Sequence, residues 1–138
     1  MSFSVTLCVS CLNRTESFYR EVLHLSILRH QLQRGMPEIL ILNHGSGTIL
    51  FREKVALQSQ HPALFAPLDR HPWGLGCSIE FEVADLEHVR RELARRQQPL
   101  LYELSDEEFG WEELWVHDPD GYLIILSQGP SETDPRAK

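Results

Sequence analysis

The sequence predicts an α+β fold of two similar modules, each with the element order strand, helix, strand, strand, strand. Three observations lead to this prediction. Each half opens with an apolar segment of period two, this segment runs into a helical apolar stripe, and strand-like segments follow. The two openings also correspond at one constant spacing, because Ser4, Val9 and Leu12 match Ser78, Val83 and Leu86.

The composition limits the kind of protein. The chain has 138 residues, enough for one domain or two small modules that share a core. Its formal net charge of −7 argues against binding to a nucleic-acid backbone. No apolar stretch is long enough to cross a bilayer, the N-terminus lacks a signal-peptide pattern, and three cysteines fit a reducing compartment. We therefore expect a cytoplasmic protein without nucleic-acid or membrane partners.

The first module is expected to span residues 1–54. Its first strand has apolar residues at alternate positions, and Ser10 is suited to cap a helix that starts near Cys11. The apolar residues of this strand are Phe3, Val5, Leu7 and Val9. The helical stripe is made of Leu12, Phe18, Tyr19, Val22 and Leu23. The remaining strands are expected at Ile27–Leu32, Glu38–Leu42 and Thr48–Glu53.

A connecting segment is expected at residues 55–76, followed by the second module at residues 77–128. The connection contains three prolines and is long for a loop, so we expect it to pack or to carry function. In the second module Asp85 is a good N-cap for a helix. Three strands should follow, at Pro99–Leu104, Glu112–His117 and Tyr122–Ser127, with a type I turn at Asp118. Residues 129–138 are expected to be a disordered tail.

Several motifs in this order resemble the vicinal oxygen chelate superfamily. They are Ser17–Leu23, Val83–Leu86, and Gly110–Glu113 running into Asp118–Tyr122. The superfamily includes glyoxalase I, bleomycin-resistance proteins, fosfomycin-resistance proteins and extradiol dioxygenases. The resemblance covers about residues 3–128 and implies two βαβββ modules whose curved mixed sheets enclose a cavity. In proteins of this size it also implies a homodimer in which each subunit contributes to the cavity.

The resemblance also implies where a metal would bind. The ligand positions of the family's metalloenzymes correspond here to Ser4, Leu50, Ser78 and Ile125. Leu50 and Ile125 have no ligating atom, and a serine hydroxyl is a poor ligand for a divalent transition metal. We therefore expect no metal and no other cofactor.

The alternation of strand residues, combined with the family register, predicts the lining of the cavity. Glu113, Trp115 and His117 should point inward, as should the residues that share a strand face with the four metal positions. The candidate ligand-binding residues are Thr6, Leu50, Arg52, Ser78, Glu80, Trp115, Leu123 and Ile125. This mixture of apolar, aromatic and charged side chains suits an amphipathic or cationic organic ligand. The same alternation also fits a plain division between core and solvent.

Three hypotheses for the function follow. The first is metal-independent binding of a small organic molecule in a cavity between the modules, as in the bleomycin-resistance branch. The second is an enzyme of lyase, isomerase or dioxygenase type, with an atypical metal site or with metal-free acid–base chemistry. The candidate catalytic residues are Glu80, Glu82, Glu113 and His117. The third is an interaction module whose own side chains fill the cavity.

Overall fold

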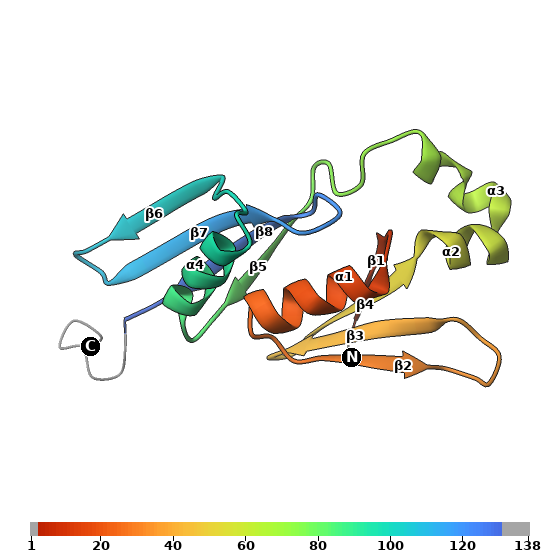
Figure 1. Cartoon of the computed structure of the whole chain (residues 1–138), viewed down its shortest axis with the longest axis horizontal. Coiled ribbons are helices and arrows are strands. Elements are labelled where there is room, and N and C mark those ends of the chain that lie inside the picture. The colour runs from red at the N-terminus through yellow and green to blue at the C-terminus, as the bar shows by residue number, and fades with distance from the viewer. Residues whose placement is uncertain (1–2, 131–138) are drawn as a thin grey trace. The chain divides into compact units, whose positions relative to one another are not determined.

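A four-stranded mixed sheet forms the first of two compact units in the computed structural model, which describes residues 3–130 (Figure 1). The strand order is β1-β4-β3-β2, with β1 parallel to β4 and the other pairs antiparallel. The strands are β1 (Val5–Val9), β2 (Ile27–Gln31), β3 (Glu38–His44) and β4 (Gly47–Glu53). Helix α1 (Leu12–Ser17) continues as a π-helical turn, η1 (Phe18–Val22), and packs on one face of the sheet.

Three short helices follow the first sheet, and the first unit, Met1–Leu75, includes them. They are α2 (Lys54–Gln60), α3 (Pro62–Phe65) and the 3₁₀ helix η2 (Ala66–Asp69). Lys54 Nζ lies 2.5 Å from Asp69 Oδ1, and Gln58 Nε2 donates to the carbonyl of Phe65. The segment expected as a connection is therefore helical over most of its length.

The second unit, Gly76–Lys138, repeats the topology of the first. Its strand order is β5-β8-β7-β6, with β5 parallel to β8 and the other pairs antiparallel. Its elements are β5 (Ser78–Glu82), α4 (Leu86–Arg95), β6 (Tyr102–Asp106), β7 (Trp111–His117) and β8 (Leu123–Gln128). The predicted α+β fold with two βαβββ modules is thus confirmed.

Each sheet buries one face against its own helix. In the first unit Phe51 on β4 is fully buried, and its ring lies 4.9 Å from that of Tyr19, measured between centroids. In the second unit Leu86, Val89 and Leu93, which share one side of α4, are buried. This side of the helix faces a set of buried residues on one side of the sheet: Phe81, Leu114, Val116, Ile124 and Leu126, with Val83 directly after β5.

One prediction for the helix after the first strand is wrong. Ser10 does not cap α1, because the N-cap is Cys11 and the Ser10 hydroxyl accepts a hydrogen bond from Arg14 instead. The apolar face of the first strand is only partly buried. Phe3 lies before β1 and is 84% exposed, and Val5, at the start of this edge strand, is 42% exposed.

Two local predictions in the second module are confirmed. The Asp85 side chain accepts a hydrogen bond from the backbone N–H of His88, as an N-cap does. The turn at Asp118 closes through a backbone hydrogen bond from Gly121 to the Asp118 carbonyl, and Gly121 has φ +91°. No helix among residues 3–130 is both long and apolar enough to cross a membrane. Most of the predicted disordered tail, residues 131–138, lies outside the described residues.

Candidate functional site

The face of the second sheet that points away from α4 carries most of the predicted site residues. We call it the distal face. Strand register arranges its side chains in three rows, because directly paired residues point to the same side of a sheet. The rows are Ser78–Leu123–His117, Glu80–Ile125–Trp115–Tyr102 and Glu82–Ser127–Glu113–Leu104. Trp111 shares this side because it alternates with Glu113 and Trp115 along β7.

Two tryptophan side chains hold the carboxylate of Glu113. Trp111 Nε1 donates to Glu113 Oε2 at 2.9 Å, and Trp115 Nε1 donates to Glu113 Oε1 at 3.0 Å. The ring of Trp115 meets that of Tyr102 edge to face, with 5.1 Å between their centroids. Trp111, Glu113 and Trp115 are partly exposed, and Tyr102 is 50% exposed. The cluster of Tyr102, Trp111, Glu113 and Trp115 is therefore a preformed group of aromatic and acidic side chains that solvent can reach.

The two indole groups change the acidity of Glu113. The hydrogen bond from Trp115 and then that from Trp111 lower the pKa of the carboxyl group, because both stabilise its ionised form. A carboxylate with a lowered pKa is a weak base and is not protonated near neutral pH. Among the four candidate catalytic residues, Glu113 is therefore poorly suited to general acid–base catalysis.

The other predicted residues of the distal face differ in how far solvent reaches them. Ser78, Glu80, Glu82 and His117 are exposed, and Leu123 is partly exposed. His117 also accepts a hydrogen bond at its backbone carbonyl from Gln98 Nε2 at 2.6 Å. Ile125 is only 6% exposed, so it is packed within the sheet surface, between Glu80 and Trp115 in the register. A ligand on this face would meet Trp115 and Leu123 before Ile125.

The remaining candidates, Thr6, Leu50 and Arg52, belong to the first unit. Thr6 is the direct partner of Leu50 in the β1–β4 pairing, and Cys8 is the partner of Arg52. Leu50 is also paired with Ile41 on β3, so Thr6, Leu50 and Ile41 lie side by side on one face. Thr6 is exposed, whereas Leu50 and Arg52 are partly exposed. The three predicted residues thus form one neighbourhood within their own sheet.

The residues at the four positions where the family resemblance places a metal do not fit a divalent metal. Leu50 and Ile125 offer only hydrocarbon, and Ser4 and Ser78 offer only neutral hydroxyl groups, which are poor ligands for a transition metal. Within residues 3–130, no three or more His, Cys, Asp and Glu side chains gather closely enough to hold a metal ion. These four side chains therefore do not supply a suitable set of ligands for a divalent transition metal.

Trp111 and Tyr102 were not among the predicted site residues. The signal for Trp111 was present, because Trp111, Glu113 and Trp115 alternate along a predicted strand and so share a face. Tyr102 could not be assigned without the pairing of β6 with β7, which places it opposite Trp115. The assignment of the predicted residues to a binding site stays a prediction.

No protein-family model matches the chain, and no curated protein matches its sequence. Many solved structures match its fold. A lactoylglutathione lyase from Agrobacterium tumefaciens is 18% identical with a TM-score of 0.59, and 93% of each chain is covered. A fosfomycin-resistance protein from Mesorhizobium loti is 13% identical with a TM-score of 0.56, covering 94% of this chain and 92% of that one.

A third similar structure is a glyoxylase/bleomycin resistance protein/dioxygenase domain from Frankia sp. EAN1pec. It is 18% identical with a TM-score of 0.59, and the match covers 96% of this chain and 93% of that one. At such identities the likeness concerns the fold, which supports many chemistries. The paired modules, their strand order and these neighbours together show that the chain has the fold of the vicinal oxygen chelate superfamily.

Proposed function

We propose that this protein binds a small organic molecule on the distal face of its second sheet, without a divalent metal. The observation that carries the proposal is the row Glu80–Ile125–Trp115–Tyr102. In this row an isoleucine stands where the family resemblance places a metal ligand, and aromatic rings lie beside it. The position is thus suited to apolar contact and unsuited to coordination.

The chemistry of the distal face supports this function. Small-molecule sites combine apolar and aromatic surface with a few placed polar groups. Here Trp115, Tyr102 and Leu123 supply partly exposed apolar surface, and the Glu113 carboxylate has a fixed orientation because two indole groups hold it. A group that is already oriented loses little side-chain freedom when a ligand binds, which favours affinity.

Three further parts of the proposal come from the family resemblance. The ligand would lie in a cavity between the modules, the chain would form a homodimer, and the protein would act in the cytoplasm. Light scattering coupled to size-exclusion chromatography measures the dimer directly, and a ligand-bound crystal structure locates the ligand. A monomer at all concentrations would remove the dimer from the proposal and leave the distal face in place.

A thermal-shift screen tests the binding function. The library contains aromatic cations, glycopeptide antibiotics, and neutral and anionic aromatic compounds, and the protein is first dialysed against EDTA. Two variants are screened in parallel. Leu123→Lys changes a partly exposed residue of the distal face, and Val55→Lys makes the same kind of change at a 72% exposed position on α2.

The expected result is at least one compound that raises Tm of the wild type and of Val55→Lys. Its effect is lost in Leu123→Lys and is unchanged when zinc or manganese is added. The proposal would be contradicted by a library without any stabilising compound, by stabilisation that requires a metal, or by stabilisation that Leu123→Lys leaves intact.

A further inference from the structure

We propose that the ligand of the distal face is an organic cation whose charged head binds beside Glu113. The proposal rests on the binding function proposed above and specifies the class of ligand. It is carried by the geometry of the four-residue cluster and by the distribution of charge in the second unit.

The Glu113 carboxylate is held in place by two indole groups. Each of its oxygens accepts one indole N–H, at 2.9 Å and 3.0 Å. A carboxylate offers about four lone-pair directions, so roughly half of its accepting capacity is left. The indole donors are neutral, and they orient the negative charge without cancelling it. The carboxylate is thus a fixed anionic group that can attract a cation.

Aromatic rings lie beside this carboxylate. Trp111 and Trp115 direct their N–H edges at Glu113, and Tyr102 packs edge to face against Trp115. An indole attracts a cation through its electron-rich face and not through its N–H edge, so a cation beside Glu113 gains from these rings where it lies over a face, within about 6 Å of the centroid. Tryptophan gives the strongest attraction of this kind, and an alkylated ammonium head gains apolar contact with the same rings.

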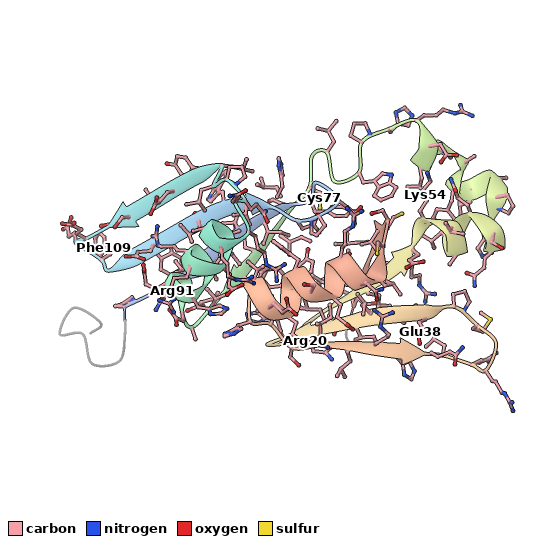
Figure 2. The ribbon with its side chains drawn as sticks, in the orientation of Figure 1. Arg20, Glu38, Lys54, Cys77, Arg91 and Phe109 are labelled. Atoms are coloured by element: carbon pink, nitrogen blue, oxygen red, sulfur yellow. The ribbon has the colours of Figure 1, made fainter. Side chains whose placement is uncertain are left out.

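The positive charges of the second unit lie on one side of it, at α4. The Lys and Arg residues among its described residues, 76–130, are all on α4 or at its end: Arg90, Arg91, Arg95 and Arg96. Figure 2 shows Arg91 on that helix. Arg90 pairs with Glu87, Glu103 and Glu112, while Arg95 and Arg96 pair with Glu92.

The distal face itself carries three carboxylates, at Glu80, Glu82 and Glu113, and no Lys or Arg of the unit's described residues. An anionic ligand would be repelled by these groups, and a neutral ligand would gain hydrogen bonds from them but no charge attraction. A cation is therefore the class of ligand that the charge pattern favours.

A matched pair of probes tests this inference. 4-(Trimethylammonio)phenol and 4-tert-butylphenol have nearly the same shape and differ in charge. Binding is measured by isothermal titration calorimetry and by tryptophan fluorescence, with the wild type, Glu113→Gln and the control Glu108→Gln. Glu108 is an exposed residue of the β6–β7 connection, so its change removes one carboxylate of the same unit outside the cluster.

We expect the wild type to bind the cation about tenfold or more tightly than the neutral probe, as cation–π and charge attraction together imply. Glu113→Gln should weaken binding of the cation about tenfold and leave binding of the neutral probe unchanged. Glu108→Gln should bind both as the wild type does. Glu113→Gln also disturbs the contacts of Glu113 with the two indole groups. Glu80→Gln is therefore a second variant, at an exposed position, and should weaken binding of the cation by a smaller factor.

Three outcomes would overturn the inference, and they differ in what they say of the binding function. Equal binding of both probes, lost in Leu123→Lys, would show a site on the distal face that does not select cations. Binding of the cation that neither Glu113→Gln nor Glu80→Gln weakens would place it elsewhere. No binding of the cation would reject this class of ligand, while the library screen decides separately whether the face binds anything.

Discussion

Gln128 Oε1 accepts a hydrogen bond from the backbone N–H of Leu86 at 2.9 Å, across 42 residues of sequence. The same contact recurs in the first unit, where Glu53 Oε1 accepts from the N–H of Leu12 at 3.0 Å across 41 residues. In each unit the end of the last strand thus caps the first N–H group of the helix. The repeat is therefore visible in a single capping contact as well as in strand order.

Loss of this cap should weaken the second unit. Gln128→Ala removes the bond to Leu86 and a second bond from Gln128 Nε2 to the Ala84 carbonyl at 2.8 Å. We expect the free energy of unfolding to fall by about 1–2 kcal/mol. Urea denaturation followed by circular dichroism measures the change. The control Gln60→Ala, at the exposed end of α2, should stay within about 0.5 kcal/mol of the wild type. Equal effects of the two variants would show that the cap does not stabilise the fold.

A glycine after α4 should stabilise the protein. Gln97 has φ +55° and completes a helix-ending motif, in which Gln98 N donates to the Leu93 carbonyl and Gln97 N donates to that of Ala94. Glycine adopts this conformation without strain, so Gln97→Gly should raise the free energy of unfolding by up to about 1 kcal/mol. Gln97→Ala keeps the strain and should give no such gain. A loss of stability in Gln97→Gly would contradict this reading of the helix end.

Acid should weaken the contribution of Glu113. Folding lowers the pKa of the Glu113 carboxyl group. Its contribution to the free energy of unfolding is therefore complete above the pKa of a glutamate in the unfolded chain, about 4.3. This contribution is lost as the pH falls through the lower pKa of the folded state. At pH 7, Glu113→Gln should lower the free energy of unfolding by no more than about 1 kcal/mol, because the carboxylate is partly solvated. Urea denaturation of the wild type and of Glu113→Gln over a pH series should show that the difference between their free energies of unfolding disappears in acid. A gap that does not depend on pH would contradict the assigned hydrogen bonds.

Ile125 should tolerate a smaller side chain and reject a carboxylate. Because the Ile125 side chain is only 6% exposed, Ile125→Val should lower the free energy of unfolding by about 0.5–1.5 kcal/mol. Ile125→Glu should cost more than about 2 kcal/mol, since it buries a charge without a partner. The partly exposed neighbour Leu123→Glu is the matched control and should cost less. Chemical denaturation gives all three values. An Ile125→Glu variant as stable as the wild type would show that the position is open to water.

The element order could be predicted because its signals are local. The helix cap at Asp85 and the turn at Asp118 depend on residues within a few positions, and both are observed. The cap of α1 could not be predicted, because its acceptor, Glu53, becomes a neighbour only when β4 pairs with β1. The exposure of Val5 likewise depends on its place at the start of an edge strand.

The candidate site was predictable to the same extent. Alternation indicates which residues share a side of one strand, but register decides which residues of different strands become neighbours. Glu80, Ile125 and Trp115 were all expected on one side, and the pairings place them in one row. The low exposure of Ile125 and the contact of Trp115 with Tyr102 depend on packing, which no local pattern encodes.

Elemental analysis of the protein, purified without chelating agents, is the most direct test of the proposed metal-independent function. The hydrocarbon side chains of Leu50 and Ile125 predict that no divalent transition metal is held in stoichiometric amount. They also predict that dialysis against EDTA leaves the affinity for any ligand unchanged. One zinc, manganese, nickel, cobalt or iron ion held tightly by each chain, and required for the ligand to bind, would contradict the account.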